Sequence, residues 1–163
     1  METDLARESI AAPAARLRIT MKTQGEIESE ISKCMGRFEL DYMGRGPKEV
    51  RSYLISDLVV VRLSGVLTAA EQHLVKTLAA EKGRDLLKQV RSHLMEIARP
   101  AIEAMIKGIT GVNVASVHHD INTSTGEEVV LFTMAEPLEF REPKRRSSES
   151  SFDAPFVFHP IAL

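Results

Sequence analysis

The sequence predicts an α+β domain of two layers, in which an antiparallel four-stranded sheet carries about three helices, packed mainly on one face. The first observation is a pair of alternating, β-branched segments, each divided by turn-forming residues, which is typical of two β-hairpins. The second is the order of patterns along the chain: helix, hairpin, two helices, hairpin. This order lacks the strand–helix–strand alternation that builds parallel sheets.

The patterned residues lie in the middle of a chain of 163 residues, of which 44% are hydrophobic and 27% charged, values that fit one soluble domain. Residues 23–134 form the predicted domain. We expect residues 1–22 to be an N-terminal arm, because they show no clear amphipathic stripe. We expect residues 135–163 to be a flexible C-terminal tail, because prolines and serines are concentrated there.

The first helix is predicted to begin after Thr23, since Thr23 and Glu26 have the spacing of a capping box. Its apolar positions recur every three or four residues, as expected for one face of a helix: Ile27, Ile31, Cys34, Met35, Phe38 and Tyr42. Gly44 is predicted to end this helix, because glycine readily adopts the left-handed conformation found after helices.

Two hairpins are predicted from alternating sequence on either side of short polar turns. The first joins Glu49–Ile55 to Leu58–Ser64 through a two-residue turn. The second joins residues 112–121 to residues 128–134 through a loop rich in Asn, Ser, Thr and Gly.

The second helix is predicted to begin at a capping box formed by Thr68 and Glu71 and to end near Gly83. A third helix follows from about residue 84, with Pro100 expected to kink or divide it. The residues predicted to face the core are Leu87, Val90, Leu94, Ile97, Ile102, Met105 and Ile106. Gly108 or Gly111 is expected to end this helix.

Composition argues against several classes of protein. Lys and Arg total 21 and Asp and Glu total 23, so no net positive field attracts nucleic acid, and we expect no such partner. The single cysteine, Cys34, forms no internal disulfide, and its place on an apolar stripe suggests burial rather than nucleophilic reactivity. No apolar run approaches the length of a transmembrane segment. We expect a cytoplasmic protein that is either free or peripheral to the membrane.

A small-anion site is one interpretation of the glycine-containing loop after the first helix. Glycines can turn successive backbone amides toward an anion, and basic side chains at the rim add positive charge. The hypothesis assigns anion binding to Gly44, Arg45, Gly46 and Lys48. In the alternative interpretation the glycines and Pro47 only end the helix and turn the chain, with the basic side chains in solvent.

No catalytic set or cofactor can be assigned from the sequence. His118 and Asp120 can share one face of a strand, with His119 on the other, but two ligands do not make a metal site, so none is predicted. An enzyme of unknown reaction stays open as an alternative, with His118, Asp120 and Arg62 as its candidate residues. Arg51, Arg62 and Arg91 would form a cationic surface if the fold brought them together, although separate solvated side chains explain them equally.

Taken together, five segments resemble the MpsC-like family: residues 23–28, 42–47, 65–71, 110–112 and 120–121. This family was a domain of unknown function and is now described as one component of a sodium-translocating, membrane-potential-generating system. The resemblance covers residues 23–134, and it brings no established catalytic residues with it.

The resemblance implies a non-catalytic accessory or regulatory protein that binds a protein partner. That partner is expected to belong to a membrane system for cation or inorganic-carbon transport. We also expect a homo-oligomer, formed through a sheet edge or the apolar helix stripes. The alternative function is a sensor of bicarbonate, phosphate or a phosphorylated metabolite, in which the loop from Gly44 to Lys48 binds the anion.

Overall fold

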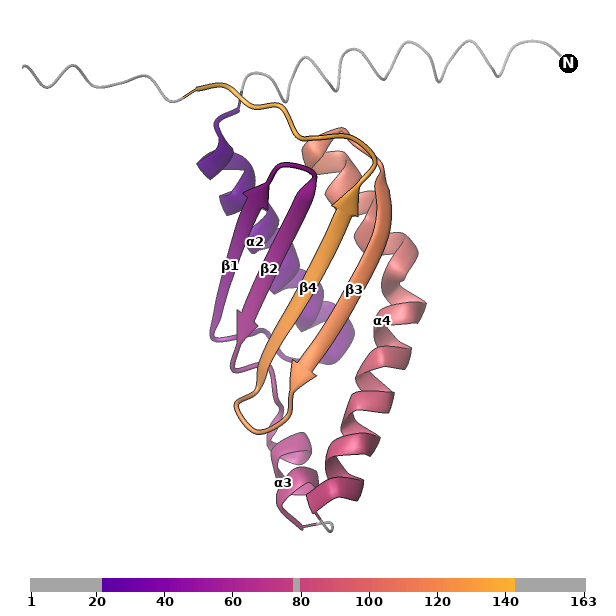
Figure 1. The fold of residues 1–163 in the computed structure, drawn as a ribbon. Helices are drawn as coiled ribbons and strands as arrows, with labels where there is room; N and C mark the ends of the chain where they lie inside the picture. The colour runs from indigo at the N-terminus through magenta and orange to yellow at the C-terminus, as the bar shows by residue number, and fades with distance from the viewer. Residues whose placement is uncertain (1–21, 78–79, 143–163) are drawn as a thin grey trace, which may run out of the picture.

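The computed structural model describes residues 22–77 and 80–142, and its fold confirms the predicted α+β class (Figure 1). The helices are α2 (Gln24–Met43), α3 (Ala69–Thr77) and α4 (Ala80–Thr110). The strands are β1 (Glu49–Ile55), β2 (Leu58–Ser64), β3 (Val114–Asn122) and β4 (Glu127–Met134).

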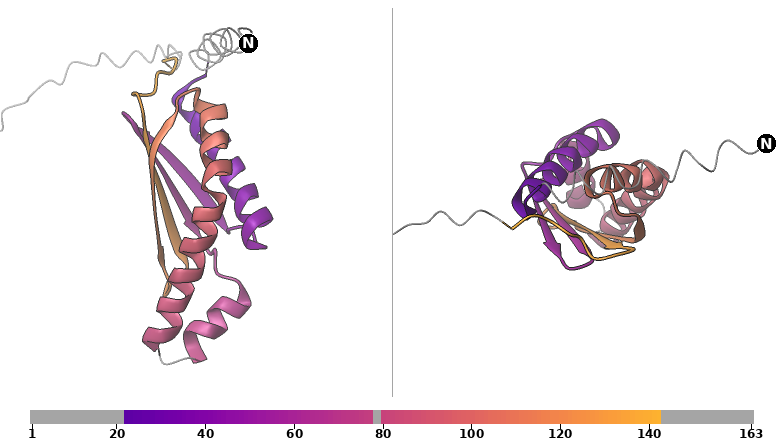
Figure 2. Two further views of the ribbon diagram at one scale, coloured as in Figure 1. Left: turned by 90° about the vertical axis from the view of Figure 1, so that its right-hand side faces the viewer. Right: turned by 90° about the horizontal axis from the view of Figure 1, so that it is seen from above.

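The sheet has the strand order β1-β2-β4-β3, and every neighbouring pair is antiparallel. The two hairpins therefore meet through their second strands, and Val61 of β2 pairs with both Ser52 of β1 and Val130 of β4. Figure 2 shows α2 and α4 side by side on one face of the sheet. The two layers enclose a single apolar core, since one face of each strand is buried against the helices.

Both ends of α2 follow the sequence prediction. The Thr23 side chain accepts a hydrogen bond from the Glu26 backbone, and the Glu26 carboxylate accepts one from the Thr23 backbone at 2.7 Å. Gly44 has φ 74°, a left-handed conformation that side chains with a Cβ rarely adopt. Of the predicted stripe, Ile27, Ile31, Met35 and Phe38 are buried, which anchors α2 on the sheet, whereas Tyr42 is exposed.

The helices after β2 divide differently from the prediction. The capping box of Thr68 and Glu71 is present. However, α3 ends at Thr77, α4 begins at Ala80, and Gly83 lies inside α4, so the predicted boundary near Gly83 is wrong. Gly83 is buried there, one helical turn before the buried Leu87.

Pro100 does not divide α4, which continues from Ala80 to Thr110. The proline is exposed, while Ala98 and Ile102 on either side are buried in the core. Packing on both sides of the proline holds the helix together, although the ring removes one backbone donor. Gly111, with φ 71°, follows the last helical residue, in agreement with one of the two predicted ends.

After β4, residues 135–142 run past the β1–β2 turn toward the start of α2 (Figure 1). Leu138 is buried and its backbone donates to Ser56 O at 3.2 Å, and Arg141 donates to Lys22 O at 2.8 Å. Residues 1–21 and 143–163 lie outside the described residues, so the predicted N-terminal arm and flexible tail stay predictions.

Candidate functional site

A cavity of about 350 Å³ lies where four segments meet beside α3. The loop after α2, the connection from β2 to α3, α3 itself and the β3–β4 turn all contribute to it. Its lining residues are Arg45, Lys48, Gly65, Leu67, Gln72, Val75, Lys76, Thr123, Ser124, Thr125 and Gly126. These described residues supply basic, hydroxyl, carboxamide and aliphatic side chains, and none of them has a carboxylate.

Three cationic side chains reach this cavity from three different segments: Arg45, Lys48 and Lys76. Arg45 Nη1 donates to Leu67 O at 2.9 Å, which fixes the guanidinium in the wall. Lys48 and Lys76 have no ion-pair partner within residues 22–77 and 80–142. A hollow with unneutralised positive charge favours an anion.

The structure separates the residues of the predicted anion loop. Arg45 and Lys48 line the cavity, but Gly44 and Gly46 do not. Gly44 caps α2, as the alternative interpretation holds, and Gly46 lies near Gly36 O. Sequence reasoning missed Lys76, because that residue follows Lys48 by 28 positions and reaches the same cavity only through the fold.

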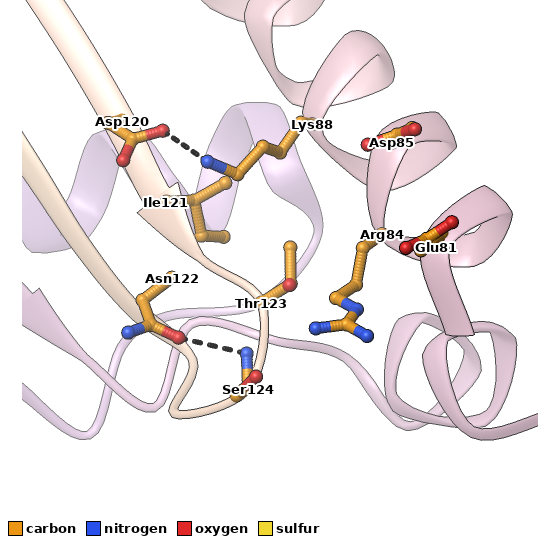
Figure 3. Close-up of a pocket in the computed structure, with 9 residues that line it drawn as sticks. All are labelled: Glu81, Arg84, Asp85, Lys88, Asp120, Ile121, Asn122, Thr123 and Ser124. Carbon is orange, nitrogen blue, oxygen red and sulfur yellow. Dashed lines mark hydrogen bonds and ion pairs between the residues drawn. The ribbon is translucent and has the colours of Figure 1, made fainter.

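A second hollow, of about 470 Å³, lies between the start of α4 and the end of β3 (Figure 3). Its charges are mixed, and Lys88 Nζ lies 2.8 Å from Asp120 Oδ1. The hydrogen bond from Lys88 lowers the pKa of Asp120 below its usual value, so this carboxylate stays ionised. Asn122 Oδ1 accepts from the Ser124 backbone in the adjacent turn at 3.0 Å. Opposite charges therefore offset one another here, unlike in the first cavity.

Of the residues suggested for metal binding or catalysis, Asp120 and Arg62 are engaged in separate contacts. As predicted, His118 and Asp120 are exposed on one face of β3 while His119 points to the other. Asp120 pairs with Lys88, and Arg62 binds Glu127 through two hydrogen bonds of 2.7 and 3.0 Å. Within the described ranges, no three His, Cys, Asp or Glu side chains are placed to hold one metal ion.

The structure does not place Arg51, Arg62 and Arg91 on one cationic surface, because the Arg91 side chain is only 1% exposed. Arg51 and Arg62 are exposed neighbours on the sheet, whereas Arg91 lies in the core between α4 and the sheet. Arg91 donates to Glu128 Oε2 at 2.6 Å, to Glu71 Oε1 at 3.0 Å and to Val66 O at 3.1 Å. These contacts tie α4 to β4, to α3 and to the segment before α3.

Glu39 completes the buried charge cluster, which we define as Glu39, Glu71, Arg91, His119 and Glu128. Glu39 Oε2 is 3.6 Å from Arg91 Nη1, and neither carboxylate oxygen of Glu39 has a hydrogen-bond partner among the described residues. Burial, together with the nearby charge of Glu128, raises the pKa of Glu39 to about 8, against the opposing effect of Arg91. Glu39 is therefore mostly protonated at neutral pH.

The remaining members of the buried charge cluster are hydrogen-bonded to one another. Burial alone would raise the pKa of Glu71, but hydrogen bonds from Arg91 and from the Thr68 backbone outweigh it and lower that pKa. His119 Nε2 and Glu128 Oε1 share a hydrogen bond of 2.7 Å. Four secondary-structure elements thus meet at Arg91, and His119 adds β3 through its contact with Glu128.

The sequence contains a signal that could have located this cluster. Glu39 follows Met35 by four positions, Arg91 lies four positions from both Leu87 and Met95, and Glu128 alternates with Val130. Each charged residue therefore occupies a core position of an apolar pattern. A charge at such a position indicates a buried partner, because an unpaired buried charge is costly.

Helix α4 carries a second apolar stripe that the domain leaves uncovered. Val90, Leu94 and Ile97, which were predicted to face the core, are 47%, 37% and 73% exposed. Leu87, Ile102 and Ile106 do face the core, as predicted, and Met95 and Ala98 are buried beside them. Leu86, 45% exposed, extends the uncovered stripe by one turn. The prediction of a single apolar stripe was wrong because α4 is apolar on two sides.

Within the described residues no helix is long and apolar enough to cross a membrane. The fold and its surfaces define a small α+β domain with a cationic cavity and an uncovered helix stripe. Residues 23–136 match the family model described as "Na+-translocating membrane potential-generating system (MpsC)". The chain belongs to this family.

A curated relative supports the same assignment. The chain is 39% identical over 118 residues to the uncharacterized protein YbcI of Bacillus subtilis (strain 168), an alignment that covers 72% of this chain and 93% of that protein. No solved structure matches the chain.

Proposed function

We propose that this protein is a non-catalytic accessory component that acts in the cytoplasm and binds a membrane-associated protein of a cation or inorganic-carbon transport system. The family description names a sodium-translocating membrane system, and the described part of this chain has no membrane-spanning helix. A peripheral role is compatible with both findings. The uncovered stripe of α4 is the observation that carries this proposal.

The stripe has the geometry of a surface that receives another helix. Leu86, Val90, Leu94 and Ile97 follow one another at spacings of four, four and three residues, as in the seam between packed helices. These positions span roughly 16 Å at 1.5 Å per residue. Since the four residues are apolar and exposed, we assign the stripe to an apolar helix face of the membrane partner.

We assign the interface of the homo-oligomer to a different surface, the edges of the sheet. Strands β1 and β3 are the outer strands of the sheet, and their free edges can pair with a second copy of the chain. The two assignments predict that a change in the α4 stripe disturbs the membrane partner and leaves the oligomer intact.

Replacing Ile97 with glutamate tests the stripe. We expect Ile97→Glu to lower by about tenfold the amount of a cation-transport membrane protein that co-purifies with the tagged chain, because a buried unpaired charge is costly at an apolar interface. Recovery from detergent-solubilised membranes is quantified by mass spectrometry. The mass of the pure protein, measured by light scattering, should not change.

Leu40→Glu is the matched control, because Leu40 is 54% exposed on α2, outside both the α4 stripe and the outer strands of the sheet. It should leave recovery unchanged, and both variants should keep the wild-type unfolding midpoint. If Ile97→Glu and wild type recovered equal amounts of the membrane protein, the α4 stripe would not be its binding surface. If Ile97→Glu converted the oligomer to a monomer, the α4 stripe would be the interface with a second copy of the chain and not with the membrane partner.

A small-anion sensor is the second candidate function, favoured by the cationic cavity of Arg45, Lys48 and Lys76. The candidate ligands are bicarbonate, phosphate and phosphorylated metabolites. Neither lysine has an ion-pair partner among the described residues, so an anion would meet positive charge that the domain itself does not neutralise.

A further inference from the structure

We propose that the cationic cavity binds a phosphomonoester, with the phosphate held by Lys48, Lys76 and Arg45 and a small organic group held by the aliphatic wall. This inference rests on the sensor function proposed above and names its ligand class. It rests on the charge, the size and the hydrogen-bonding groups of the cavity.

The charge of the cavity favours a dianion. Three cationic side chains surround a hollow with no carboxylate in its lining. Coulombic attraction grows with the charge of the ligand, so a doubly charged phosphomonoester gains more than a singly charged anion. Lysines supply point charges for phosphate, and Arg45, fixed by its bond to Leu67 O at 2.9 Å, adds a positioned donor group.

The size of the cavity favours an organic phosphate over a bare anion. Its volume of about 350 Å³ falls in the range of small-molecule sites, which begins at roughly 300 Å³. Leu67 and Val75 form an aliphatic wall of the cavity. Such a wall does not stabilise an inorganic ion, but it can bury the carbon atoms of a larger ligand.

The hydrogen-bonding groups of the cavity are side chains rather than a backbone nest. The Ser124 and Thr125 amides both donate to Asn122 Oδ1, at 3.0 and 3.2 Å, so these amides are occupied. The Thr125 hydroxyl accepts from the Glu127 backbone at 3.3 Å, which leaves its own hydrogen for a ligand oxygen. Recognition therefore depends on the lysines, the guanidinium and the turn hydroxyls.

The experiment measures binding by calorimetry to the full chain, with sodium bicarbonate, inorganic phosphate and glycerol 3-phosphate as probes. We expect glycerol 3-phosphate to bind most tightly, and its affinity to rise between about pH 5 and pH 7 as the phosphate takes its second charge. The variant Lys48→Gln with Lys76→Gln should weaken this binding by roughly tenfold or more, since two charge-assisted contacts are removed.

The matched control is Lys33→Gln with Lys107→Gln, which removes the same charge from exposed lysines outside the cavity. It should bind like wild type, and unfolding midpoints confirm that both double variants fold. If the control variant weakened glycerol 3-phosphate binding as much as the cavity variant does, the cationic cavity would not be the binding site. If only bicarbonate or inorganic phosphate bound, and the cavity variant lost this binding, the phosphomonoester proposal would be wrong and the small-anion sensor would be supported. Binding of no probe would remove both.

A phosphomonoester can also be a lipid headgroup, so vesicles of phosphatidylcholine with and without phosphatidic acid form a second arm. Retention on phosphatidic acid vesicles that the cavity variant loses and the control keeps would support the same chemistry with a lipid as its source. Equal retention of all variants would count against the cavity as the phosphate site.

Discussion

Replacing Arg91 with methionine is expected to lower the free energy of unfolding by about 3–5 kcal/mol, the usual cost of removing one partner from a buried ion pair. The side chain is 1% exposed, and its loss would leave the Glu71 and Glu128 carboxylates without their main donor. Methionine retains most of the side-chain volume, so charge rather than cavity formation dominates the effect. Chemical denaturation at neutral pH measures it.

Arg62→Met supplies the control for this comparison. Arg62 also binds a glutamate through two hydrogen bonds, but its side chain is 51% exposed. Water screens that pair, and we expect its loss to cost less than about 1 kcal/mol. Similar losses for the two variants would show that Arg91 is no more important to stability than a surface arginine, and the buried charge cluster would lose its structural role.

The second large effect is the pH dependence of stability caused by Glu39. The pKa of this carboxyl is raised from 4.5 to about 8, so the folded protein binds a proton that the unfolded chain releases. Stability from this group is fully present below pH 4.5 and is lost as the pH rises toward 8. The loss amounts to at most about 1.4 kcal/mol for each pH unit in this window.

Glu39→Gln should remove this dependence, because glutamine resembles the protonated acid and does not titrate. The difference in unfolding free energy between the variant and wild type should shift in favour of the variant from pH 5 to about pH 8 and then level off. Urea denaturation at several pH values measures this difference, in which other titrating groups largely cancel.

Glu127→Gln is the matched control for the pH experiment. Its hydrogen bond with Arg62 lowers the pKa of Glu127, so this half-buried carboxylate is ionised in both states above about pH 5.5. Its difference from wild type should stay constant from about pH 5.5 to pH 8. A constant difference for Glu39→Gln as well would mean that Glu39 is ionised in the folded protein at neutral pH.

Local signals in the sequence predicted most of the secondary structure. Thr23 and Glu26 form the expected capping box, and Glu49–Ile55 and Leu58–Ser64 have the predicted bounds. These features depend on residues a few positions apart, whose side chains and backbone dihedrals decide the outcome locally. Gly83 and Pro100 misled the prediction, because tertiary packing outweighed their low helix propensity.

The candidate site was predicted only in part. Arg45 and Lys48 could be named because they lie close together in a conspicuous loop, but Lys76 and the β3–β4 turn join them through the fold. The buried charge cluster was missed for a similar reason. Residues 39, 71, 91, 119 and 128 come from five elements, and no short spacing connects them.

The sequence by itself determined where most helices and strands begin, which residues turn the chain, and to which class the fold belongs, because these depend on neighbouring residues. The tertiary structure alone decided that Arg91 is buried, that Glu39 holds a proton near neutral pH, and that one side of α4 stays uncovered. Burial and desolvation depend on what packs against a side chain, and that partner can lie anywhere in the sequence.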